Sequence, residues 1–383
     1  MVRVCIKVLI DDQIFRKQKV GGISNYFLSL LKEFQSNSEL KVKLGVILYK
    51  TEKLSRNNAR NIGRYNSRAY VIPAILLNNL KMLWVRYELI HSTFYSRWSI
   101  ALLGRKTHIV TVHDMIPEDF PEFFDQGNPN EYKGRYIQDA NGIITVSQYT
   151  YERLLHHYPG ITCPITIIPL ASRFGLQKTD IVDLKSKFEE MSLLFVGPRG
   201  GHKNFEALIK SLTELTHLVP EISLICVGGG SFSTDEIQQF ASVGVDKHIH
   251  QIECNDEELK DLYLKCSLYV CPSIAEGFGL PSVEAASMST PVIVGKNSYL
   301  GGKLPDSLVL IDVDDIEEMV RKIHRLLSNF DVYEKSAIST YDNVMDLSWS
   351  NTSDKTLQFY LSALKKSRPQ RSIRSFAAWK KVN

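Results

Sequence analysis

CPSIAEGFGLPSVEA, residues 271–285, is the stretch of this sequence that decides its fold. The short apolar run 268–270 before it predicts the end of a buried strand. Gly277 and Gly279 permit positive φ and close backbone approach, and Pro281 suits the start of a helix, where its missing N–H costs nothing. The stretch therefore predicts a strand, a glycine loop and the N-terminus of a helix.

This loop has the features of an anion site. The free N–H groups and the positive dipole end of a helix N-terminus attract anions, most often phosphate. Glu276 and Glu284 lie within the same stretch. A carboxylate repels phosphate, so we interpret both as acceptors for the hydroxyl groups of a ribose or a sugar ring. A capped helix after a tight turn is the alternative for a short glycine pattern.

Length and composition are those of a globular protein. The 383 residues favour two or three domains, and 44% hydrophobic with 23% charged residues is ordinary for such a chain. No apolar run approaches the roughly 18 residues of a transmembrane helix. Residues 1–10 contain Lys7 and lead into Asp11, which predicts a first strand and no signal peptide. Six cysteines without a Cys-x-x-Cys motif predict buried thiols in a reducing compartment, the cytoplasm.

The positive charge belongs to the C-terminal tail. Residues 365–383 carry seven Lys and Arg and no acid, so removing them from a net charge of +4 leaves the body near −3. This distribution argues against nucleic acid as a partner. The segment 367–383 also contains Phe376 and Trp379, and is either a disordered tail or an amphipathic segment on an anionic membrane surface.

A metal site is not expected. His248, His250 and Cys254 lack a fourth ligand, so we expect no metal.

Strand-like and helix-like segments alternate in both halves of the chain. Expected strands are 4–10, 41–49, 88–92, 108–112, 142–146, 164–170, 192–196, 222–227, 267–270 and 291–294. Expected helices are 21–34, 74–85, 129–140, 148–157, 205–215, 256–265, 283–289 and 351–364. The alternation predicts parallel sheets covered by helices, and its break near residue 175 predicts two Rossmann-like domains. In such domains ligands bind at the carboxyl ends of the strands, so both halves should contribute loops to one cleft.

The spacing of Glu276 and Glu284, with seven residues between them, resembles the donor-site signature of the retaining glycosyltransferases of family 4. The resemblance spans roughly residues 1–365 and is densest from 192 to 295. It implies the GT-B fold, an α/β architecture with two Rossmann-like domains facing across a cleft. The implied divisions are 1–172, the acceptor-side domain; 173–347, the donor domain; 348–366, a helix that crosses back to brace the N-terminal domain; and 367–383, the basic tail.

The resemblance also assigns the donor site. In the family the first glutamate contacts the donor sugar and the second the ribose, which implies these roles for Glu276 and Glu284. The backbone of Gly277, Phe278, Gly279 and Leu280 would position the diphosphate.

Two cations are implied for the diphosphate, Lys203 and Arg199. Pro198 follows Gly197 here, so Arg199 lies one position later than in the commonest form of the family, and Lys203 is the stronger assignment. A cation pair suits a leaving group whose negative charge grows as the sugar bond breaks. A solvated loop is the alternative for an Arg and a Lys before a helix.

In the first half, three positions resemble the family. Gly22, after the first strand, would let the backbone approach the donor phosphate or the acceptor. His113, at the end of the strand 108–112, would contact the donor sugar or the transferring centre, and a core or capping role is its alternative. Ser147 lies at a strand-to-helix turn, where its simplest role is that of an N-cap.

The function that follows is a retaining glycosyltransferase. It would move a hexose, with mannose favoured, from a nucleotide sugar to a hydroxyl of a glycan or a lipid-linked oligosaccharide. Glu276 and His113 would stabilise an oxocarbenium-like transition state. GDP-mannose is the favoured donor, and no metal or other cofactor is expected because Lys203 and Arg199 supply the positive charge. Its place would be the cytoplasm, with a peripheral position on the inner face of the membrane left open.

Three alternatives remain at this point. One is a transferase that uses UDP-glucose, UDP-galactose, UDP-GlcNAc or dTDP-rhamnose, and another is a nucleotide-sugar-binding protein without turnover. A GT-B epimerase or phosphorylase is the third, although no pyridoxal-binding lysine is evident. A nucleotide-dependent dehydrogenase is excluded because residues 8–14 contain no glycine, whereas its dinucleotide fingerprint requires several.

Overall fold

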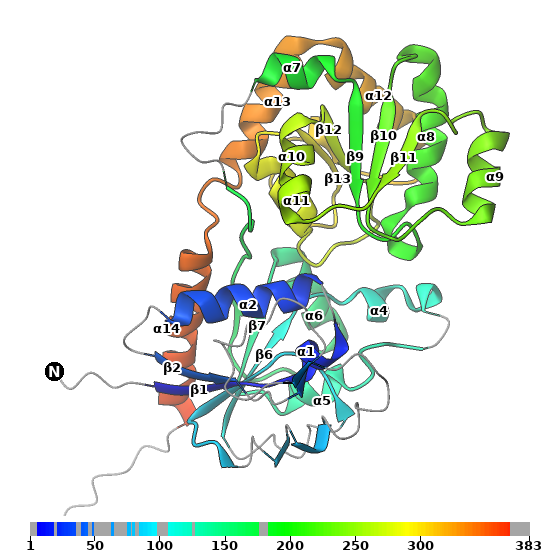
Figure 1. The fold of residues 1–383 in the computed structure, drawn as a ribbon. Coiled ribbons are helices and arrows are strands. Elements are labelled where there is room, and N and C mark those ends of the chain that lie inside the picture. Colours follow the sequence, from blue (N-terminus) through cyan, green and yellow to red (C-terminus); the bar gives the residue numbers. More distant parts are fainter. Residues whose placement is uncertain are drawn as a thin grey trace, which may run out of the picture.

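The computed structural model describes residues 6–18, 21–35, 40–44, 48–49, 63–64, 75–77, 79–80, 84–97, 106–124, 127–175 and 183–367. It places them in two α/β domains, one above the other in Figure 1. All of the tail after Ser367 lies outside the described residues, as do residues 74, 78 and 81–83 of the helix expected over 74–85.

The N-terminal domain is built on a parallel six-stranded sheet with the order β2-β1-β5-β6-β7-β8. Its strands are β1 (Ile6–Ile10), β2 (Leu40–Leu44), β5 (Leu89–Ser92), β6 (Thr107–Val112), β7 (Gly142–Thr145) and β8 (Ile165–Ile167). Its helices are α1 (Gln13–Lys17), α2 (Gly22–Gln35), α4 (Ile116–Asp119), α5 (Lys133–Gln138) and α6 (Gln148–His157), with a 3₁₀ turn at Pro121–Phe123. Two short strands, β3 (Leu48–Tyr49) and β4 (Gly63–Arg64), pair apart from this sheet.

The C-terminal domain repeats the plan with the strand order β11-β10-β9-β12-β13-β14. Its strands are β9 (Ser192–Val196), β10 (Ser223–Val227), β11 (Ile249–Ile252), β12 (Leu268–Cys271), β13 (Val292–Gly295) and β14 (Val309–Leu310). Its helices are α7 (Leu184–Glu189), α8 (Phe205–Leu218), α9 (Thr234–Ser242), α10 (Asp256–Lys265), α11 (Leu280–Ser287), α12 (Ile316–Ser328) and α13 (Phe330–Asp342), with 3₁₀ turns at Gly201–Lys203 and Asp306–Leu308.

Burial explains why these segments form a parallel sheet. All six residues of β6 are buried, as expected for a strand covered by helices on both faces. The amphipathic helix α2 buries one stripe of side chains, Tyr26, Phe27, Leu30, Leu31 and Phe34. In Figure 1, α2 and α6 lie at the upper edge of the N-terminal domain and α11 at the facing edge of the C-terminal domain. The expected two-domain α/β architecture is confirmed.

The last helix, α14 (Trp349–Ser367), returns from the C-terminal domain to pack along the N-terminal domain (Figure 1). Its Tyr360 is buried, and the hydroxyl lies 2.6 Å from Nδ1 of His91 in β5. The other ring nitrogen of His91 lies 2.8 Å from the Thr111 hydroxyl in β6. Phe359 packs over Gly142, where an added Cβ would lie 2.8 Å from the Phe359 ring. The helix expected to cross back therefore does so through close packing and buried hydrogen bonds.

Several expected boundaries are wrong for local reasons. The strand expected over 41–49 includes β3, which pairs with β4 in a separate sheet. The helix expected over 129–140 begins only at Lys133, because residues 129–132 form turns. The helix expected over 283–289 begins at Leu280, since Gly279 in the left-handed region, with φ of 83°, starts it three residues earlier. The helices α1, α4, α7, α9, α12 and α13 and the strands β4, β11 and β14 were not expected.

The hydrogen bond of Tyr360 should contribute measurably to stability. We expect Tyr360→Phe to lower the free energy of unfolding by about 1.5 kcal/mol, because it leaves a buried imidazole nitrogen without its partner. Urea denaturation followed by circular dichroism measures this. The control is Tyr151→Phe, since the Tyr151 hydroxyl makes no hydrogen bond with the described residues, and an equal loss in both variants would contradict the assignment.

Candidate active site

The glycine loop between β12 and α11 brings the two domains together. A Cβ at Gly277 would lie 1.9 Å from the carbonyl oxygen of His113 and 3.0 Å from Cβ of Asp114, both in the N-terminal domain. Only glycine therefore allows this approach. Gly279 has φ of 83°, and Pro281 lies in the first turn of α11, as the sequence pattern predicts.

Glu276 is held as a buried, ionised carboxylate. Its Oε1 accepts hydrogen bonds from Nζ of Lys203 at 2.5 Å and from Oγ of Ser273 at 2.7 Å. Burial acts to raise the pKa of Glu276, but the Lys203 ammonium and the Ser273 hydroxyl outweigh it and hold that pKa below its ordinary value. Burial likewise opposes the charge of Lys203, yet Glu276 raises the pKa of that amine. The two groups therefore form a charged pair within the C-terminal domain.

Glu284, in α11, is bound by two residues that the sequence did not reveal. Arg173, in the segment joining the domains, donates from Nε to its Oε1 at 2.8 Å, and Tyr263 donates to its Oε2 at 3.2 Å. Arg173 also donates to Oδ1 of Asp256 at 2.6 Å. Burial raises the pKa of Glu284, while Arg173 acts in the opposite direction. Each carboxylate oxygen keeps acceptor capacity for one more hydroxyl.

His113 extends this chemistry from the opposite domain. It follows β6, and its Nε2 is buried and forms no hydrogen bond with any described residue. Its ring packs edge-to-face on Tyr26, with centroids 5.2 Å apart. Burial lowers the pKa of His113 to about 4, so the imidazole is neutral near pH 7. A neutral, unpartnered ring nitrogen is a ready hydrogen-bonding group for a sugar hydroxyl.

A cleft of about 370 Å³ joins these groups. Of the site residues expected from the sequence, it is lined by Gly22, His113, Glu276, Gly277, Phe278, Gly279 and Leu280. Lys203 reaches it through the carboxylate of Glu276. Asp114, Asn130 and His202 also line it and were not expected as site residues. Asp114 could have been found from its position directly after His113, whereas Asn130 carries no signal in its surroundings.

Arg199 is not brought to this cleft. Its Nε donates to Glu236 Oε1 at 2.6 Å, and its Nη1 donates to the carbonyl oxygens of Gly228 at 3.1 Å and Gly230 at 2.9 Å. The guanidinium also lies over the Phe232 ring, 4.8 Å from its centroid. Arg199 thus supports the glycine turn 228–230, consistent with its displacement by Pro198 along the chain. Glu284 does not line the cleft either: it is buried, and Arg173 and Tyr263 hydrogen-bond to its carboxylate.

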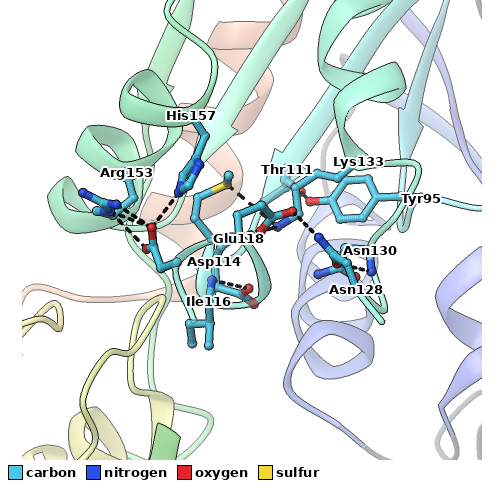
Figure 2. Close-up of polar contacts among 12 residues, drawn as sticks. Tyr95, Thr111, Asp114, Ile116, Glu118, Asn128, Asn130, Lys133, Arg153 and His157 are labelled. Carbon is cyan, nitrogen blue, oxygen red and sulfur yellow. Dashed lines mark hydrogen bonds and ion pairs between the residues drawn. The ribbon is translucent and has the colours of Figure 1, made fainter. Parts of the chain in front are cut away.

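The loop that carries His113 and Asp114 rests on a buried lysine (Figure 2). Lys133, in α5, is 1% exposed, and its Nζ donates to the carbonyl oxygen of Asp114 at 2.8 Å and to Oε2 of Glu118 at 2.7 Å. At the end of α4, which follows this loop, Asp119 accepts hydrogen bonds from Arg153, and its Oδ1 lies 2.6 Å from Nε2 of His157. One wall of the cleft is therefore fixed by charges packed behind it.

Metal binding and membrane crossing are considered only for the residues that the structure describes. Within the described ranges, no group of three or more His, Cys, Asp or Glu residues is placed to hold a metal ion. His248 instead has its Nδ1 2.8 Å from the carbonyl oxygen of Ile222. Across the same part of the chain, none of the helices has the length and apolar character that crossing a bilayer requires.

The arrangement defines a class of protein. Two Rossmann-like domains present a neutral histidine and an ionised carboxylate to one cleft, with a glycine loop and a helix N-terminus beside them. These are the parts of a GT-B enzyme that transfers a sugar from a nucleotide. Family comparison agrees: residues 20–171 match the model described as Glycosyltransferase Family 4, and residues 177–340 match that described as Glycosyl transferases group 1. The chain belongs to this family of glycosyltransferases.

Two relatives of known name are both called O-antigen chain mannosyltransferases. The chain is 28% identical over 258 residues to the O-antigen chain mannosyltransferase RfbU of Salmonella typhimurium, covering 64% of this chain and 67% of the relative. It is 22% identical over 379 residues to the O-antigen chain mannosyltransferase B of Escherichia coli, covering 90% and 97%. Among solved structures, Anabaena HepE in complex with UDP and glucose is similar with a TM-score of 0.71 at 16% identity, covering 93% of this chain and 100% of that chain.

The buried pair behind the His113 loop should be strongly coupled. We expect Lys133→Met to lower the free energy of unfolding by about 3 kcal/mol, because it leaves the Glu118 carboxylate buried without its cation. The double variant Lys133→Met, Glu118→Gln should lose clearly less, since no unpaired charge remains. Urea denaturation of the single and double variants measures the coupling, and a double variant as unstable as the single one would contradict it.

Proposed function

We propose that this chain is a retaining mannosyltransferase that uses GDP-mannose and acts on a hydroxyl of a surface glycan or of its lipid-linked precursor. The observation that carries the transfer chemistry is the ionised Glu276–Lys203 pair on the donor side of a cleft whose other side holds neutral His113. The choice of mannose is supported by the names of the two O-antigen relatives. HepE, at 16% identity, bears on the fold alone.

The proposed roles follow from charge and position. The role proposed for Glu284, acceptor of the ribose hydroxyls, rests on the resemblance to the family, since Glu284 does not line the cleft in this structure. Lys203 lies where its ammonium can pair with the diphosphate as well as with Glu276. The backbone of the glycine loop and the start of α11 add N–H groups toward the phosphates. His113 and Glu276 contact the donor sugar, and Glu276 stabilises the positive charge that develops on it. Lys203 provides charge stabilisation without a metal.

Retention follows from attack on the leaving-group side. The acceptor hydroxyl bonds to the anomeric carbon as the bond from that carbon to the diphosphate breaks, and a phosphate oxygen takes the hydroxyl proton. The products are the new glycoside and the nucleoside diphosphate. Glu276 suits an electrostatic role better than that of a nucleophile, because Lys203 and Ser273 already bind its Oε1.

The acceptor and the location extend this proposal. A lipid-linked acceptor would place the enzyme at the inner face of the membrane, where the basic segment 367–383 would contact anionic lipid. A nucleotide-sugar-binding protein without turnover is the alternative function. The presence of Glu276 and His113 in one cleft, with Lys203 paired to Glu276, argues for turnover.

A panel of nucleotide sugars tests the donor. We expect GDP-mannose to raise the melting temperature without added metal, and to be hydrolysed slowly to GDP, because a ligand that binds only the native state stabilises it. Differential scanning fluorimetry followed by chromatography of the nucleotides measures both. UDP-glucose, UDP-galactose, UDP-GlcNAc and dTDP-rhamnose are the controls. Stabilisation by one of these in place of GDP-mannose would replace the donor, and binding without hydrolysis or transfer would favour the binding-protein alternative.

The two glutamates should separate binding from turnover. We expect Glu284→Gln to weaken GDP binding about tenfold, roughly 1.4 kcal/mol, because an amide replaces the ribose-binding carboxylate. Glu276→Gln should leave GDP binding within about twofold and lower the transfer rate about a hundredfold, since it removes charge stabilisation of the transition state. Isothermal titration with GDP and a transfer assay measure the two effects, with exposed Glu334→Gln as control. Equal GDP affinity in both glutamate variants and the wild type would remove the ribose assignment.

A further inference from the structure

Two hydroxyl groups of the N-terminal domain converge on one carbonyl of the donor-side glycine loop. Ser147 donates from Oγ to the carbonyl oxygen of Gly277 at 2.5 Å, and Thr150 donates from Oγ1 to the same oxygen at 3.0 Å. Both side chains are almost fully buried, at 0% and 1% exposure. We call this arrangement of Ser147, Thr150 and Gly277 the two-hydroxyl contact.

The start of α6 places both hydroxyls on the same side. Ser147 is the N-cap of α6, as the sequence predicts, and its Oγ accepts a hydrogen bond from the backbone N–H of Thr150 at 3.0 Å. The cap uses Ser147 only as an acceptor, so its own hydrogen is available to the Gly277 carbonyl at 2.5 Å, which is nearer than its other acceptor, Thr150 Oγ1 at 3.1 Å. Thr150 lies one turn along the helix, and its side chain points to the same carbonyl. The cap explains the position of Ser147 but leaves the donation across the cleft without an explanation.

The carbonyl that receives both bonds lies next to the catalytic glutamate in the chain. Gly277 is packed so closely against the His113 loop that a Cβ there would lie 1.9 Å from the His113 carbonyl oxygen. On its other side, the backbone N–H of Glu276 donates to the carbonyl oxygen of Asn297 at 2.8 Å. The peptide between Gly277 and Phe278 is thus held by groups of the opposite domain, while the peptide before Glu276 is held within its own domain.

We propose that Ser147 and Thr150 are positioning residues for sugar transfer, which hold Glu276 opposite His113 through the Gly277 carbonyl when the cleft is closed. The inference rests on the proposed function. Opening of the cleft to release products must break both hydrogen bonds, and closing must form them. The two-hydroxyl contact therefore links the approach of the two domains to the placement of the Glu276 carboxylate.

Thr150 offers the cleaner variant, because Ser147 is also the helix cap. Thr150→Val keeps the shape of the side chain and removes its hydroxyl, and Thr150→Ser restores that hydroxyl. Thr213→Val is the matched control, since Thr213 Oγ1 donates to the Ile209 carbonyl oxygen within α8 of the C-terminal domain. Three quantities are measured on the full chain: the radius of gyration in solution without ligand, the dissociation constant of GDP, and kcat for transfer from GDP-mannose.

We expect Thr150→Val to raise the radius of gyration and to lower kcat about tenfold. The reason is that the closed state loses a buried hydrogen bond and is therefore less populated. The dissociation constant of GDP should stay within about twofold, because the nucleotide is bound by the donor domain. Thr150→Ser should restore both values, and Thr213→Val should change neither. A purely structural role of Thr150 would lower stability without this separation of kcat from GDP binding.

Two results would overturn the inference. One is a wild-type radius of gyration in Thr150→Val, and the other is a larger radius with kcat unchanged in an active enzyme. A wild-type chain that transfers no sugar from any nucleotide sugar would refute the proposed function instead. In that case the radius of gyration alone decides whether the two-hydroxyl contact holds the domains together.

Discussion

The close approach of two backbones, at Gly277 in one domain and His113 in the other, is the constraint on which the rest of this structure depends. There is no room for a side chain at that point, so the glycine loop after β12 and the loop after β6 meet directly. The meeting brings Glu276 and His113, which are far apart in the sequence, to one cleft. The hydrogen bonds from Ser147 and Thr150 to the Gly277 carbonyl cross between the domains at the same place.

The helix α14 acts on the same region from behind. Tyr360 binds His91, His91 binds Thr111, and the Tyr26 hydroxyl lies 3.3 Å from the Thr111 hydroxyl. The ring of Tyr26 then packs on His113. A continuous series of buried contacts thus runs from the end of the chain to the cleft, so that the returning helix supports both the N-terminal core and the orientation of the histidine.

Local sequence patterns predicted most of the fold and the glycine loop. Pairing between residues far apart in the sequence was the main feature that they did not predict. Glycines, Pro281 and the spacing of Glu276 and Glu284 are signals contained within fifteen consecutive residues, and they indicate the glycine loop and the start of a helix near Pro281. Arg173 pairs with a residue 111 positions away, and nothing beside it in the chain indicates a carboxylate partner. Lys133 was expected on a helix, but its complete burial depends on the loop folded over it. Arg199 shows the opposite case. The local sequence resembles the family pattern and predicted a phosphate-binding cation, but Pro198 shifts Arg199 by one position, and its side chain binds Glu236.

The position of Arg173 has a consequence for how this enzyme can be divided. It belongs to the segment between the domains, yet it supplies the cation that opposes the effect of burial on Glu284. A donor domain cut from the chain at its first strand would keep every residue of the glycine loop and lose this cation. Its buried glutamate would then favour the protonated form, which accepts hydroxyl groups less well. The charge state of Glu284 is therefore a property of the joined chain, although Glu284 itself lies in the C-terminal domain.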